Sequence, residues 1–202
     1  MLSPILVGIL ILIAYVHTKQ ILKHKFVLYA IAWILVGIVV AFNDLPFLTP
    51  FIKGFVGFAF LYVVMIAGAL NPRWKLTMRL KSVRTPYSII GFTILIAHPL
   101  SYATEILSRS REIPWFGIAA FLVMIPLFIT SYITIRKKMK PATWVKLQKW
   151  AYLSYALIFV HLIVNASSVQ NRVAAILLFI PYLSLKLTKE FKHWKSKRVD
   201  SK

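Results

Sequence analysis

The stretch FIKGFVGFAFLYVVMIAGAL, residues Phe51–Leu70, contains a single charged side chain, Lys53. A helix of about 20 apolar residues is long enough to cross the hydrocarbon core of a bilayer. Other stretches approach the same length, and the full set is Leu2–His17, Phe26–Phe42, Phe51–Leu70, Tyr87–Leu107, Trp115–Ile135, Trp150–Ala166 and Val173–Leu187. The first of them reaches full length only by including a lysine. The sequence therefore predicts an all-α integral membrane protein, a bundle of six to seven transmembrane helices.

The composition excludes several classes of protein. Of 202 residues, 59% are hydrophobic and 15% are charged, which is not the composition of a water-soluble domain. Because the chain has no cysteine, it forms no disulfide, thiolate metal site or iron–sulfur cluster. Its seven glycines are not spaced as a phosphate-binding loop. Any cofactor must therefore be held by nitrogen, oxygen or apolar packing.

Basic residues predict the orientation of the chain. Lysine and arginine in short loops stay on the cytoplasmic side of a membrane. Of the 25 Lys and Arg residues, all but four fall on one side of the predicted bundle, and the exceptions are Lys53, Arg109, Arg111 and Arg172. We therefore expect a multi-pass protein of the plasma or inner membrane, with its N-terminus on the outer side and its C-terminus in the cytoplasm. The net charge of +20 is explained by this topology and by anionic lipid, without a nucleic-acid partner.

Two histidines lie inside predicted membrane segments, where polar side chains are costly. His98 is eleven positions beyond Tyr87, and His161 is eleven positions beyond Trp150. Because both segments are predicted to run from inside to outside, the imidazoles should lie at equal depth, about 16 Å along each helix. Two facing imidazoles at one level can be the axial ligands of a haem iron. We therefore predict His98 and His161 as a haem-binding pair.

The surroundings of the pair are also predicted. Gly91 and Ser101 beside His98, and Ser154 with Leu157 beside His161, are small or apolar residues at helical spacing that leave room for a macrocycle. Haem propionates would point to the outer surface, where the available cations are Arg109, Arg111 and Arg172.

A structural role is the alternative for these histidines. A single intramembrane histidine is often a hydrogen-bond donor between helices, and His98 precedes Pro99, whose kink exposes backbone. If the histidines have this structural role, the protein is a small membrane transporter or scaffold with structural histidines. His17, His24 and His193 lie among lysines at the predicted inner boundary and are expected to be solvated.

Two stretches resemble a known family. They are PLFITSYITIRKKMKPATWVKLQKWAYLSYALIFVH (Pro126–His161) and HPLSY (His98–Tyr102), and they are similar to the ferric-reductase-like transmembrane family, most closely to the haem-binding membrane subunits of periplasmic methionine-sulfoxide reductase systems. The resemblance implies a cytochrome b-like electron-transfer subunit of an oxidoreductase system, without catalytic residues of its own. It implies a haem-binding domain over residues 26–189, with an extra helix at 1–25 and a basic cytoplasmic tail at 190–202.

One position departs from the family pattern. Gln148 stands where the relatives carry a further histidine, thirteen residues before the one that matches His161. Neither Arg84 nor Thr85, at the same offset before His98, replaces that ligand, so we expect one haem b rather than two. The electrons would then come from FMN, a cytoplasmic flavin reductase or a quinol, and pass to an extracytoplasmic acceptor protein. The basic stretches 73–84 and 136–149 are candidate docking sites for an anionic donor.

Overall fold

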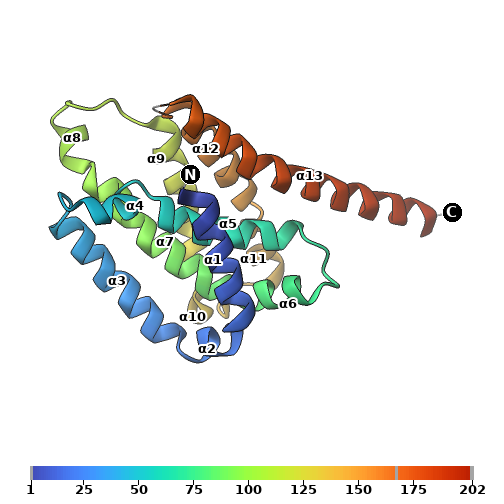
Figure 1. Cartoon of the computed structure of the whole chain (residues 1–202). Coiled ribbons are helices and arrows are strands. Elements are labelled where there is room, and N and C mark those ends of the chain that lie inside the picture. The colour runs from blue at the N-terminus through green and yellow to red at the C-terminus, as the bar shows by residue number, and fades with distance from the viewer. Residues whose placement is uncertain (1, 167, 201–202) are drawn as a thin grey trace.

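The computed structural model describes residues 2–166 and 168–200, and the secondary structure in this part of the chain is entirely helical (Figure 1). The predicted all-α class is confirmed. The helices are α1 (Leu2–Val16), α2 (Thr18–Lys23), α3 (Lys25–Ala41), the 3₁₀ turn η1 (Pro46–Leu48), α4 (Thr49–Ile52), α5 (Phe55–Ala69), α6 (Lys75–Ser82), α7 (Arg84–Ser101), α8 (Ala103–Leu107), α9 (Trp115–Ile129), α10 (Ile133–Arg136), α11 (Pro141–Gln148), α12 (Ala151–Val164) and α13 (Val169–Asp200).

Helix α7 is central and packs against α3, α5 and α9. Its crossing with α5 is unusually close, because glycines face each other there. A Cβ atom added to Gly57 would lie 2.8 Å from the carbonyl oxygen of Gly91, and one added to Gly91 would lie 2.7 Å from Phe60 Cβ. Small residues at a helix crossing allow the two backbones to approach in this way. The packing fixes the position of α7 relative to α5.

Helix α1 belongs to the bundle. It packs on α5 and α6. The Tyr87 hydroxyl of α7 donates a hydrogen bond to the Leu10 carbonyl (2.9 Å), and the Arg79 guanidinium of α6 donates to the Tyr15 carbonyl. Ala14, on the face between these bonds, is completely buried. The segment that the resemblance leaves as an extra helix is therefore integrated into the same core.

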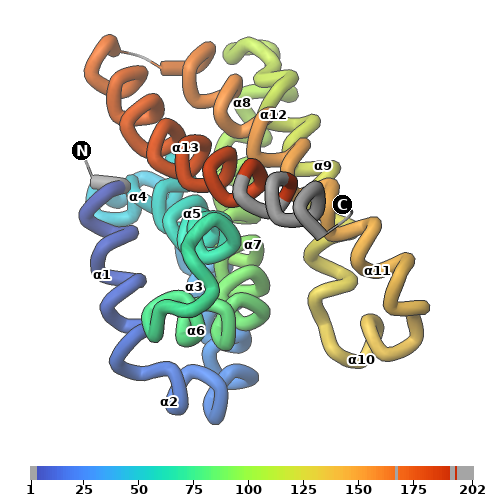
Figure 2. The backbone as a smooth tube through the Cα atoms, turned by 90° about the vertical axis from the view of Figure 1, so that its right-hand side faces the viewer, coloured from blue at the N-terminus to red at the C-terminus, as the bar shows by residue number. Residues whose placement is uncertain are grey.

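The second half of the chain packs onto the first through α13 and through the contact between α7 and α9. Helix α9 packs on α12, and α13 contacts both α12 and α5, as both views show (Figures 1 and 2). The Tyr62 hydroxyl donates to the Leu178 carbonyl at 2.6 Å, and Lys189 Nζ donates to the Gly68 carbonyl at 2.6 Å. Because α13 runs from Val169 to Asp200, the last predicted segment and the described part of the basic tail form one continuous helix.

Several predicted segments are broken where continuous helices were expected. Phe51–Leu70 is split at Gly54, whose φ of +73° ends α4 before α5 begins. Tyr87–Leu107 is split at Tyr102, between α7 and α8. Trp115–Ile135 ends as a helix at Ile129, and the Thr130 hydroxyl then bonds the Pro126 carbonyl at 2.7 Å. Hydropathy detects the apolar composition of such segments but not these local breaks.

The breaks shorten most helices below membrane length. Within the described residues, one helical stretch, Pro141–Val164 (24 residues), is long and apolar enough to cross a membrane. The bent pair Pro46–Ile52 and Phe55–Ala69, with an angle of 40°, would make a second. Only 11% of the apolar window in the first stretch is buried inside the protein. The expected six to seven spans and their orientation remain predictions.

Candidate functional site, the His98–His161 pair

The fold brings together two imidazoles that are far apart in sequence. His98 lies near the end of α7 and His161 near the end of α12. Their ring centroids are 6.3 Å apart, and the ring planes make an angle of 69°. Both side chains are half-buried. This pairing requires α7 and α12 to place the two residues at the same level of the bundle.

The separation of the rings suits one metal ion between them. Bonds of about 1.35 Å give an imidazole a radius of about 1.1 Å, and an imidazole nitrogen binds a metal at about 2 Å. Two collinear ligands on one ion then have centroids about 6 to 6.5 Å apart, against about 5 Å for a direct hydrogen bond between the rings. The observed 6.3 Å is compatible with the first arrangement and also lies in the range of ordinary packing between aromatic rings, about 4.5–7 Å.

His98 is oriented by a backbone carbonyl. Its Nδ1 lies 2.7 Å from the carbonyl oxygen of Ile52, and since a carbonyl only accepts, Nδ1 carries the proton and Nε2 presents a lone pair. Ile52 ends α4, and the break at Gly54 leaves its carbonyl free of a helical partner. His98 thus bonds the backbone of α4 rather than the backbone near Pro99 in its own helix. A ligating histidine is commonly fixed through its second nitrogen in this way.

His161 has a different second partner. Asn165, one turn further along the chain, places Nδ2 3.1 Å from His161 Nδ1 and 3.0 Å from the His161 carbonyl oxygen. In this arrangement the amide donates to Nδ1, so the ring proton lies on Nε2. Rotation of the amide by half a turn presents Oδ1 to an Nδ1 proton instead, and Nε2 is then free to bind a metal. The structure thus orients His98 for ligation more completely than His161.

Gly117 of α9 packs against the His161 ring. A Cβ atom at this glycine would lie 2.8 Å from both Cε1 and Nδ1 of the imidazole and 3.3 Å from Nε2. Any larger residue at this position would displace the ring. On the other side of the pair, a Cβ at Gly54 would lie 3.3 Å from His98 Cγ. Glycines on two different elements therefore provide the space that the two rings occupy.

An arginine and a tyrosine extend the site toward the surface. The Tyr102 ring contacts the His98 ring edge-on at 5.4 Å, and the Arg111 guanidinium lies over Tyr102 at 3.9 Å. Arg111 also forms an ion pair with Glu105 at 2.9 Å. Three arginines were predicted to bind the haem propionates. Of these, Arg111 is separated from His98 by one aromatic ring, that of Tyr102. Arg109 and Arg172 are exposed.

The structure corrects part of the predicted surroundings. Gly91 does not leave space beside His98, because α5 fills the space next to Gly91 where the two helices cross. Ser154 lines a separate cavity, described below, whereas Ser101 is buried near His98. His17 and His24 are exposed, as expected for solvated residues, and the side chain of His193 lies outside the described residues.

The donor set favours axial ligation over a closed metal site. No group of three or more His, Cys, Asp or Glu side chains able to hold a metal occurs in the described part of the chain. Two imidazoles fit the two axial positions of a haem iron, whose other four ligands come from the porphyrin. The residues present are therefore compatible with haem.

Comparison with known proteins adds no assignment. No family model, no curated protein and no solved structure matches this chain. The resemblance to the ferric-reductase-like family thus rests on the quoted sequence stretches alone.

Sequence reasoning missed three elements of the site. Gly117, the Ile52 carbonyl and Asn165 each contact an imidazole of the pair. Asn165 could have been found, because residues four apart share a face of a helix. The other two depend on how α4 and α9 pack, for which the sequence gives no local signal.

Proposed function

We propose that this chain is a membrane haem protein that holds one haem b between His98 and His161 and passes electrons to an extracytoplasmic acceptor. The observation that carries the proposal is the 6.3 Å separation of two imidazole rings from helices far apart in sequence. When bound, the haem would supply a one-electron redox centre. His98 and His161 would hold it, and the Ile52 carbonyl would keep the His98 lone pair directed at the iron.

The exposed surface supports a membrane location. Large aliphatic side chains on several helices are more than half exposed, among them Ile5 of α1 (62%), Ile34 of α3 (62%), Leu122 of α9 (58%) and Leu177 of α13 (62%). Apolar surface in water costs about 25 cal/mol per Å². Lipid removes that cost, and the low burial of the Pro141–Val164 stretch is consistent with a helix that faces lipid.

A membrane transporter with structural histidines is the second candidate. The observation in its favour is the break between α4 and α5, because discontinuous helices form the binding sites of many transporters. In that case the bond from His98 to the Ile52 carbonyl would serve only to satisfy the broken backbone. The two functions differ in whether the protein binds haem.

Absorption spectroscopy of the full-length protein tests the proposal. Protein purified in detergent from the membranes of haem-supplied cells should show a Soret band that shifts on reduction with dithionite. His98→Ala and His161→Ala should each lose most of the band, whereas His17→Ala, a matched change at an exposed position, should keep it. Circular dichroism and size-exclusion profiles would establish that each variant folds. A colourless wild-type protein, or folded alanine variants with full haem content, would overturn the proposal.

A further inference from the structure

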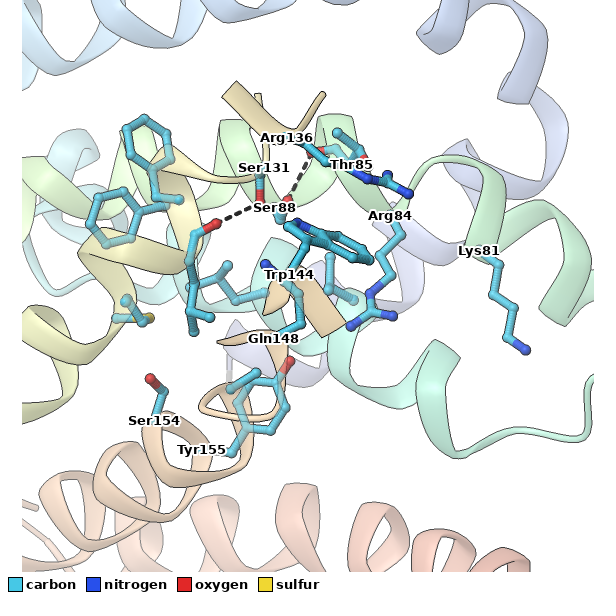
Figure 3. A pocket seen from close by; sticks show the side chains of 17 residues that line it. Lys81, Arg84, Thr85, Ser88, Ser131, Arg136, Trp144, Gln148, Ser154 and Tyr155 are labelled. Carbon is cyan, nitrogen blue, oxygen red and sulfur yellow. Dashed lines mark hydrogen bonds between the residues drawn. The ribbon is translucent and has the colours of Figure 1, made fainter. Parts of the chain in front are cut away.

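A second site lies between α7 and α12, away from the histidine pair. It is a cavity of about 220 Å³, and its walls come from α5, α6, α7, α9, α10, α11 and α12 and the turn after α9 (Figure 3). Ser154 on its wall precedes His161 by seven residues, which corresponds to about 10 Å along α12. We call the two regions the histidine end (His98 and His161) and the cavity end (Ser154, Gln148 and Trp144).

The polar groups inside the cavity are neutral hydrogen-bond donors. The Ser154 side chain is 1% exposed, and its hydroxyl has no hydrogen-bond partner. Gln148 Nε2 has a long contact of 3.5 Å to Thr130 Oγ1, at the limit of a hydrogen bond. The Tyr155 hydroxyl points toward Gln148 in Figure 3. A buried hydroxyl without a partner is costly, and a ligand with acceptor oxygens would relieve that cost.

The charged groups of the cavity lie at its exposed edge. Lys81, Arg84 and Arg136 line the cavity and are exposed. Arg136 lies over the Trp144 ring at 4.0 Å, and the indole N–H of Trp144 donates to the Thr130 carbonyl at 3.2 Å. These contacts hold Trp144 as a flat wall. No lining residue is acidic.

The remaining walls are apolar and aromatic. They include Phe92 and Phe128, whose rings pack together at 4.6 Å, together with Met124. A cavity of about 150 Å³ is enough to bind benzene, so 220 Å³ suits a head group of one or two fused rings. The cavity therefore favours a flat, uncharged ring system with carbonyl acceptors.

We propose that the cavity end binds the head group of a membrane quinone, with its two carbonyls accepting hydrogen bonds, one from Ser154 and one from Gln148. The inference rests on the proposed function in that the reduced form, a quinol, would be the electron donor: it would give two electrons to the haem one at a time, release two protons and leave the quinone. The isoalloxazine ring of a flavin mononucleotide also carries carbonyl acceptors, but its three fused rings exceed what 220 Å³ suits, and its phosphate would need the exposed Arg84 or Arg136. An anionic lipid head group would likewise depend on the arginines.

Binding of menadione, 2-methyl-1,4-naphthoquinone, to the full-length protein in detergent tests the inference. Calorimetric titration should show saturable binding. Ser154→Ala and Gln148→Leu should each weaken it about five- to ten-fold, as expected for the loss of one hydrogen bond. Thr77→Val is the control, because Thr77 is also a buried hydroxyl without a partner but does not line the cavity. This variant should bind menadione as the wild type does.

Other outcomes would overturn the inference. Absence of menadione binding, or equal affinity in the wild type and both cavity variants, would show that the cavity is not a quinone site. Titration with FMN and with inorganic phosphate provides the competing test. Binding of FMN that is lost in Arg84→Gln or Arg136→Gln, without menadione binding, would assign the cavity to an anionic ligand. A haem-containing protein that does not bind menadione would refute this inference alone, whereas a colourless protein that binds it would refute only the haem.

Discussion

The histidine end lies on α7 and α12, and the cavity end lies on α11 and α12, yet they differ in what holds their side chains. At the histidine end each imidazole has a defined partner for Nδ1, the Ile52 carbonyl or Asn165, and the rings are 6.3 Å apart. At the cavity end a serine hydroxyl is buried without a partner beside 220 Å³ of space. The difference supports our proposals of a fixed cofactor at one end and an exchangeable ligand at the other.

Backbone geometry explains part of this difference. The break at Gly54 leaves the Ile52 carbonyl free at the level of His98. Among the described residues, Gln148 has no comparable carbonyl partner, and its amide contacts the Thr130 hydroxyl. An imidazole at the cavity end would thus lack the partner that orients His98.

The largest effect is expected from Gly117→Ala. The new Cβ would lie 2.8 Å from two atoms of the His161 ring, and the ring would move because it is the far end of a side chain. We expect a folded protein with less than half of the wild-type haem content, measured as the Soret absorbance per protein.

Gly68→Ala is the matched control, because a Cβ at Gly68 meets no atom within 4 Å. It should keep full haem content. Unchanged haem in Gly117→Ala would show that the position of the His161 ring does not control the site, and the contrast between the two ends would lose its basis.

A smaller effect is expected from Asn165→Asp. A carboxylate at this position would accept from a protonated Nδ1, 3.1 Å away in the present contact, and would make His161 a more basic ligand. Ferric iron would be favoured, so a redox titration should give a reduction potential lower by on the order of tens of millivolts, the scale for one added charge at a partly exposed site. Asn43→Asp, on the loop after α3, adds the same charge without an imidazole partner and should shift the potential less. An increase in potential would contradict the proposed contact.

The smallest effect is expected from Gln148→His. This change restores the family's histidine at the cavity end, but the facing residues of α7 in the cavity are Arg84, Thr85 and Ser88, none of which is an imidazole. The ratio of haem to protein, measured by pyridine haemochrome and amino-acid analysis, should stay near one. A ratio near two in the wild type or in this variant would show that the cavity end binds haem as well.

The sequence predicted the proximity of His98 and His161 better than the path of the backbone. The equal offset of His98 and His161 from their segment starts placed the rings at one level, because helical rise is constant. The breaks at Gly54 and Tyr102 were not predicted, since a twenty-residue hydropathy average does not detect one residue with an unusual φ. The cavity was also not predicted, because it is formed by residues from seven helices and depends on their packing.

The glycine crossing between α5 and α7 also determines how the histidine end can adjust. With Gly57 and Gly91 in backbone contact, α7 cannot move closer to α5, and His98 is tied to α4 as well. His161 lies on α12, which packs mainly with α9, and this pair contacts the first half through α13 and at the packing of α9 on α7. Any change in the gap between the rings, whether to admit a planar group or to release it, must therefore come from displacement of the α9–α12 unit.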